Sequence, residues 1–193
     1  GTPGFEIEPA YDKMGWHASD THGLRFDDCR VPADHLLGTR GQGFRQFMSI
    51  LDDGRIAIAA LAVGVLQACL EESSAYAKER TSFGLPIGSY QAIAFSIADI
   101  EVMAEAARLL TYKAAWLKDT GQPYRHAAAR AKLYASESAV TATRIATQVF
   151  GGAGFLDDTL VARHYRDAKV LEIGEGTSEI QRMVIARGLG LDV

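Results

Sequence analysis

Glu175 is the residue whose type and setting best suit chemistry, since it lies between Gly174 and Gly176 just before a predicted helix. Glycine has no Cβ, so these two neighbours let the backbone and a flat ligand approach the carboxylate closely. Backbone N–H groups in the first turn of a helix lack internal partners and stabilise negative charge. The sequence therefore places a candidate proton-abstracting base beside candidate donors for an anion. A solvated turn glutamate is the open alternative at this point.

The helix after this turn is expected to begin with a capping box. Ser178 is followed three residues later by Gln181, and Ile180 and Met183 supply early apolar positions of an amphipathic helix. This pattern predicts that the side chains of Ser178 and Gln181 bond to backbone N–H groups at the helix start.

The composition is that of an ordinary globular protein. The chain has 193 residues, 48% of them hydrophobic, and a net charge of −4 without a basic block. These values argue against a nucleic-acid surface or an anionic-membrane patch. Cys29 and Cys69 lie far apart, and Cys69 falls on the apolar face of a predicted helix, which favours reduced thiols in an intracellular protein. Apolar runs such as residues 56–66 are too short to span a bilayer.

Residues 1–40 and 41–193 differ in pattern, and we expect them to be two domains. The first part carries turn residues and short β-like runs, and we interpret it as the second half of a larger β domain. The chain begins at Gly1 without methionine, which indicates a fragment.

The second part has helical periodicity. It predicts helices over residues 41–81, 89–119, 123–150, 158–167 and 177–188, separated by short glycine- and proline-containing breaks. Long helices joined by short turns form up-and-down antiparallel bundles. The predicted fold class is therefore mainly α, a helical bundle preceded by a small β segment.

Several spaced motifs resemble the acyl-CoA dehydrogenases, flavoproteins that desaturate acyl-CoA thioesters. They are residues 148–155 (QVFGGAGF), 165–169 (YRDAK), 174–181 (GEGTSEIQ), 79–84 (ERTSFG) and 90–93 (YQAI). Residues 14–16, 31–32 and 37–38 resemble the second half of the middle β domain of that family. The resemblance covers essentially the whole chain and is closest to the short-chain and branched-chain branches.

The resemblance implies that Glu175 abstracts the α-proton of an acyl-CoA while FAD accepts the β-hydride. It also implies that the Glu175 backbone N–H helps to bind the thioester carbonyl. Some relatives carry the catalytic base at the position that Gly54 occupies here, and glycine has no side chain that could act as a base. By the same resemblance, Asp52, Arg55 and Gly176 contact the acyl-CoA.

The resemblance further implies a set of FAD contacts, some of them to the flavin of an adjacent subunit. They are Arg80, Ser82, Phe83, Gln91, Gln148, Gly151, Gly152, Thr177, Ser178 and Glu179. Cofactor binding then requires a homo-oligomer, a dimer or a tetramer. Glutamine replaces Glu179 in part of the family, so its contact is the least characteristic.

The family also suggests electron-transfer flavoprotein or a similar acceptor as partner, and a cytoplasmic or mitochondrial-matrix location. Two alternatives remain: an acyl-CoA oxidase-type flavoenzyme, and a non-catalytic helical oligomerisation module. No metal site is predicted; we expect His164, Tyr165 and Trp116 to be ordinary packing residues rather than ligands. The chain by itself is expected to be inactive, because half of the flavin contacts would be missing.

Overall fold

The computed structural model describes residues 1–193. The chain divides into two compact units, Gly1–Ile50 and Leu51–Val193. The division falls inside the first long helix, α1 (Gly43–Glu79). A domain boundary near residue 40 stays a prediction.

The first unit contains an antiparallel pair of strands, β1 (Phe5–Ala10) and β2 (His22–Phe26), and a short 3-10 helix, η1 (Ala33–His35). Phe5 pairs with Phe26, and their rings lie 5.2 Å apart. Ile7, Leu24 and Phe26 are nevertheless exposed. Two strands alone are marginally stable in water, so the exposed apolar face fits the interpretation that they belong to a larger sheet.

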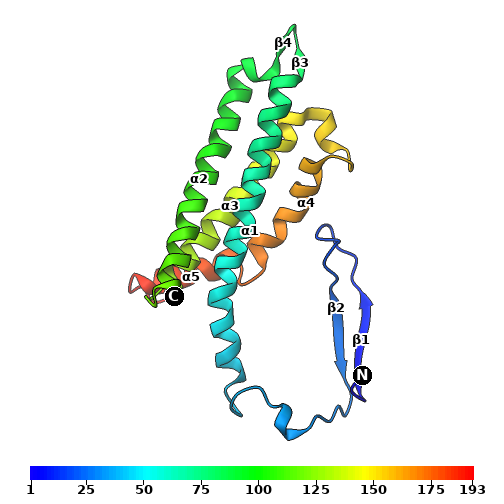
Figure 1. Cartoon of the computed structure of the whole chain (residues 1–193), viewed down its shortest axis with the longest axis vertical. Coiled ribbons are helices and arrows are strands. Elements are labelled where there is room, and N and C mark those ends of the chain that lie inside the picture. Colours follow the sequence, from blue (N-terminus) through cyan, green and yellow to red (C-terminus); the bar gives the residue numbers. More distant parts are fainter. The chain divides into compact units, whose positions relative to one another are not determined.

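The second unit is a helical bundle. After α1 come α2 (Gln91–Asp119), α3 (Arg125–Phe150), α4 (Leu160–Ile173) and α5 (Ser178–Gly188). The connections carry the short strands β3 (Thr81–Ser82) and β4 (Leu85–Pro86) and the 3-10 helices η2 (Ile87–Ser89) and η3 (Gly151–Phe155). Figure 1 shows α1 and α2 side by side and joined at one end by the β3–β4 turn. The predicted fold class is confirmed.

Tight turns reverse the chain between the long helices. Phe83 and Gly84 both have positive φ, 50° and 82°, between the paired strands β3 and β4. Two successive residues with positive φ are typical of the turns that close two-residue hairpins. Gly121, with φ of 68°, ends α2 in the same way that glycine ends many helices. These turns make α1, α2 and α3 antiparallel neighbours.

Helix α3 is the centre of the bundle and packs against α2, α4 and α5. Its buried positions are mostly small: Ala128, Ala129, Ala131, Ala135, Ala139, Ala142 and Ala146 are all fully buried. Small side chains let neighbouring helices approach closely, and they leave little room for substitution by larger residues.

Helix α1 contributes one buried stripe that includes Ala59, Ala62, Leu66 and Cys69. Length and composition alone would let this helix cross a membrane, which the short apolar runs of the sequence did not suggest. Polar bonds from α1 to other helices, such as that between Gln67 and Arg108 on α2, assign it to the bundle. Cys29 and Cys69 are both free thiols.

Two expectations need correction. Helix α4 reaches Ile173 rather than ending near residue 167, because no glycine or proline stops it before Gly174 and Leu171 extends its buried face. Trp116 and Tyr165 are not core residues, since 58% and 48% of their surfaces are exposed.

Replacing Leu66 by alanine should destabilise the bundle by about 2–5 kcal/mol, because its side chain is fully buried and leaves a cavity. Leu61→Ala on the same helix is the matched control, since Leu61 is 48% exposed. Urea unfolding of the chain followed by far-UV circular dichroism measures both. An equal decrease in the free energy of unfolding for the two variants would contradict the described packing.

Candidate active site

Glu175 lies in the turn between α4 and α5, and its side chain packs against α1. A Cβ atom at Gly54 would stand 2.2 Å from Oε2 and 2.5 Å from Cδ of Glu175. The absence of a side chain at Gly54 therefore makes the space that the carboxylate occupies. The Glu175 carboxylate is half-buried and forms no hydrogen bond or ion pair within the chain, which leaves its oxygens free to act on a ligand.

The backbone of this turn has an unusual conformation. Glu175 has φ of 55° and Gly176 has φ of 91°. A left-handed conformation costs a residue other than glycine roughly 1–2 kcal/mol, so surrounding contacts must hold it. The Glu175 N–H donates to no backbone carbonyl. The turn therefore presents a free N–H donor next to a free carboxylate, which is the pair that the sequence predicted.

The capping-box prediction is wrong. Thr177 is the N-cap residue, and its side chain makes no cap hydrogen bond. The Ser178 hydroxyl is buried without a partner. Gln181 is fully buried and donates instead to the backbone carbonyls of Glu175, at 3.2 Å, and Gly176, at 2.8 Å. Gln181 therefore holds the turn, because two left-handed residues turn these carbonyls toward its amide.

Arg55 and Asp52 lie on α1 close to this turn. The Arg55 guanidinium is buried, forms an ion pair with Asp52, and leaves its Nε without a partner. Burial lowers the pKa of Arg55, while the charge of Asp52 raises it, Arg125 lowers it, and Glu175 raises it. The structure thus brings Arg55, Asp52 and Glu175 into one electrostatic neighbourhood.

A polar cluster of Asp53, Lys118 and Tyr124 lies beside this site and was not predicted from the sequence. Asp53 on α1 accepts a hydrogen bond of 2.6 Å from the Tyr124 hydroxyl and pairs with Lys118 of α2 at 2.9 Å. The bond to Asp53 raises the pKa of Tyr124 to about 12. Asp53 lies 71 residues before Tyr124, so no local spacing could have identified the set. They tie the ends of α2 and α3 to the segment of α1 that carries Gly54.

A second cluster forms where the β3–β4 turn meets the end of α3. Arg80 and Ser82 line a cavity of 360 Å³ together with Gly151 and Gly152. Tyr76 and Phe150, whose stacked rings lie 4.1 Å apart, form part of its wall. The Arg80 guanidinium has no hydrogen bond or ion pair within the chain. Two motifs about 70 residues apart in the sequence thus build one cavity, which has a largely apolar wall and an unpaired cation.

The other predicted contact residues lie outside this cavity. Phe83 is 97% exposed at the tip of the turn, and Gln91 and Gln148 are exposed on their helices. Thr177, Ser178 and Glu179 belong to the Glu175 turn and the start of α5. The Glu179 pKa is lowered by its own backbone N–H and by the Thr177 hydroxyl.

Comparison with known proteins decides the family. Residues 41–190 match the model of the acyl-CoA dehydrogenase C-terminal domain. The chain belongs to the acyl-CoA dehydrogenase family. It is 55% identical over 188 residues to the probable acyl-CoA dehydrogenase YngJ of Bacillus subtilis, covering 97% of this chain and 50% of that protein.

Other members of the acyl-CoA dehydrogenase family are similar over the same region. The mitochondrial short-chain specific acyl-CoA dehydrogenase of Bos taurus is 49% identical over 185 residues, which cover 96% of this chain and 45% of that protein. The solved structure of butyryl-CoA dehydrogenase from Megasphaera elsdenii superposes with a TM-score of 0.95 at 47% identity, covering 98% of this chain and 49% of that one. The chain thus spans about half the length of the relatives it matches.

Gly54→Ala should reveal the close approach of Glu175 to α1. Alanine stabilises a helix relative to glycine by about 0.5–1 kcal/mol, and Gly64→Ala on the same helix should show that gain because nothing lies within 4 Å of its new Cβ. Gly54→Ala should show no gain, because its Cβ displaces the carboxylate. Urea unfolding of both variants tests this, and equal stabilisation would mean that Glu175 does not occupy the space above Gly54.

Proposed function

We propose that the full-length protein is an FAD-dependent acyl-CoA dehydrogenase that introduces an α,β double bond into an acyl-CoA thioester. The observation that carries the proposal is the unpaired Glu175 carboxylate above Gly54, on a turn where the Glu175 N–H donates to no backbone carbonyl. The reaction needs a base for the α-proton and a donor that stabilises negative charge on the thioester oxygen. This turn supplies both from adjacent atoms.

Each residue of the turn has a proposed task. The Glu175 carboxylate removes the α-proton, and its backbone N–H donates to the thioester carbonyl. Gly176 has φ of 91°, and a Cβ there would stand 2.9 Å from Gln181 Nε2, so only glycine fits the turn; we propose that its backbone contacts the acyl-CoA. Asp52 and Arg55 contact the acyl-CoA from α1, where their ion pair lies close to the Glu175 turn.

The residues present fit FAD. Arg80 offers an unpaired guanidinium, which matches a diphosphate with paired donors, and Gly151 and Gly152 leave open space where side chains would stand. FAD, when bound, supplies the acceptor for the β-hydride. We assign the diphosphate to Arg80 and Ser82, the neighbouring dinucleotide to Gly151 and Gly152, and further contacts to the remaining residues predicted above: Phe83, Gln91, Gln148, Thr177, Ser178 and Glu179.

The proposed assembly is a homodimer or homotetramer. One face of α2 supports it, because large apolar side chains lie exposed there: Phe95, Val102, Leu109, Tyr112 and Trp116. A contiguous apolar surface of this kind usually marks an interface. We further propose electron-transfer flavoprotein or a similar acceptor as redox partner, and a location in the cytoplasm, or in the mitochondrial matrix if the source is eukaryotic.

The nearest alternative is an oxidase on the same scaffold. Glu175 would perform the same proton abstraction, and only the fate of the electrons would differ. Hydrogen peroxide released per turnover separates the two: a dehydrogenase passes its electrons to a carrier protein instead. A non-catalytic module would retain no flavin in the full-length protein.

Glu175→Gln should slow flavin reduction by acyl-CoA about 10²–10⁴-fold, because the amide cannot take the α-proton. Anaerobic mixing of the full-length protein with a panel of acyl-CoAs, followed by flavin bleaching, measures the rate. FAD content should not change. Glu71→Gln, an exposed position on α1, is the control. Unimpaired bleaching by Glu175→Gln would remove the proposed role.

Arg80→Met should weaken FAD binding about 10- to 100-fold, the effect of losing charge-assisted hydrogen bonds to phosphate. The FAD content of the full-length protein after gel filtration reports it. Lys78→Met, which removes a neighbouring exposed positive charge at the end of α1, should retain FAD. Equal FAD loss in both variants would indicate a general charge effect rather than a contact of Arg80.

A further inference from the structure

Lys132 on α3 is a fully buried lysine that neither the motifs nor the proposed chemistry uses. It is the largest fully buried side chain of the protein. Burying an ammonium group costs free energy unless its N–H donors find partners. The identity of those partners therefore indicates what the lysine does.

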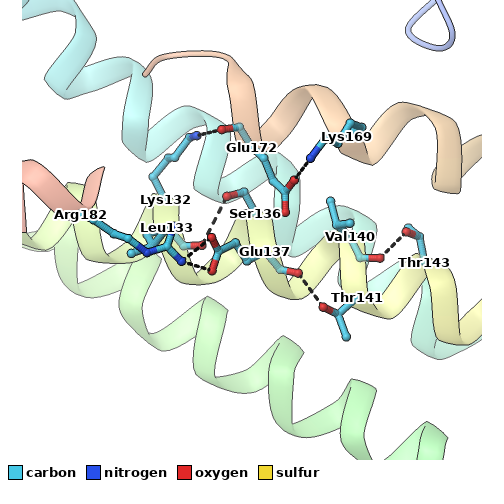
Figure 2. Close-up of polar contacts among 10 residues, drawn as sticks. All are labelled: Lys132, Leu133, Ser136, Glu137, Val140, Thr141, Thr143, Lys169, Glu172 and Arg182. Carbon is cyan, nitrogen blue, oxygen red and sulfur yellow. Dashed lines mark hydrogen bonds and ion pairs between the residues drawn. The ribbon is translucent and has the colours of Figure 1, made fainter. Parts of the chain in front are cut away.

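Both partners of Lys132 are backbone carbonyls that flank Glu175. The ammonium donates to the Glu172 carbonyl at 3.0 Å and to the Gly176 carbonyl at 2.8 Å. Figure 2 shows the Lys132 side chain extending from α3 to the Glu172 carbonyl of α4. Lys132 thus bridges the last turn of α4 and the far side of the left-handed turn.

The bond to Glu172 satisfies a group that the helix leaves unpaired. Carbonyls in the last turn of a helix have no internal donor, and a cation there also stabilises the negative end of the helix dipole. The bond to Gly176 fixes the peptide that follows Glu175. Because Gln181 donates to the same carbonyl, two fully buried donors hold one oxygen of the turn.

The charges around Lys132 do not pair with it directly. Burial lowers its pKa to about 8, Glu172 of α4 opposes this shift, Arg55 of α1 adds to it, and Glu137 of α3 and Glu179 of α5 oppose it. Glu172 and Glu137 bind Lys169 and Arg182 through their side chains. Figure 2 shows both of these pairs beside Lys132.

Burial of the Lys132 ammonium has a cost that depends on pH. The pKa of Lys132 falls from its ordinary value of 10.5 to about 8 in the folded protein, so burying the charged ammonium costs stability below pH 8. That cost disappears only as the pH rises from 8 towards 10.5. At neutral pH the protein therefore carries a buried charge, and its two hydrogen bonds go to the end of α4 and to the turn that follows Glu175.

We infer that Lys132 is a positioning residue for the proposed reaction, whose ammonium holds the Glu175 turn from behind so that carboxylate and backbone N–H face the substrate together. This inference rests on the proposed function. Lys132 contacts neither substrate nor cofactor in this account. Its loss lets the turn relax from the left-handed conformation and moves the base away from the α-carbon.

The test is Lys132→Met in the full-length flavin-loaded protein. Methionine keeps most of the stem volume and removes all N–H donors. We expect kcat to fall on the order of 10²-fold, the usual consequence of moving a catalytic group by about 1 Å. KM for acyl-CoA and FAD content should stay near the wild-type values. The isotope effect on flavin reduction with α-deuterated acyl-CoA should increase, because proton removal becomes slower.

Lys169→Met is the matched control, since Lys169 binds the side chain rather than the backbone of Glu172 and is exposed. It should leave kcat unchanged. Lys132→Gln provides a second measurement if methionine prevents folding: its shorter amide reaches at most one carbonyl, so its kcat should fall less than 10²-fold, again with a larger isotope effect.

Two results would overturn the inference. One is a kcat for Lys132→Met equal to that of wild type. The other is a parallel loss of kcat, FAD content and thermal stability with an unchanged isotope effect, which is the behaviour of a purely structural residue. Failure of the proposed function is distinguishable, because Glu175→Gln would then be as active as wild type.

Discussion

The site depends on one strained turn that packs against a gap in a helix. Glu175 adopts a left-handed backbone conformation, and its carboxylate fills the space above Gly54. Each feature depends on other residues. Lys132 and Gln181 hold the carbonyls of the turn. The carboxylate needs a helix position without a side chain, which Gly54 provides. Three helices and one turn are therefore arranged around a single acid.

The bundle makes this arrangement rigid. Helix α3 carries Lys132 in its first half, and η3, which follows its other end directly, carries the glycines that line the Arg80 cavity. Its alanine-rich surface packs closely on α2, α4 and α5. The same helix therefore supports the turn with the base and the cavity proposed for the diphosphate of FAD, and substitutions that disturb its packing affect both.

Much of the fold follows from local patterns in the sequence. Apolar periodicity and glycine breaks predicted the five helices, and the motifs around Glu175, Arg80 and Gly151 indicated the two clusters that the structure forms. Lys132 could not be predicted, because a lysine in a helix pattern normally indicates a solvated position and its partners lie 40 and 44 residues away. The capping box failed because the left-handed turn redirects Gln181 to carbonyls. The roles of the individual site residues stay predictions.

Hydrogen exchange at the substrate α-carbon tests the central claim most directly. The full-length protein is incubated with an acyl-CoA in D₂O, and the recovered thioester is analysed by mass spectrometry. If Glu175 faces the α-carbon, deuterium enters that position in the wild type and does not enter in Glu175→Gln. Exchange that persists without the Glu175 carboxylate, or none in the wild type, would contradict the account.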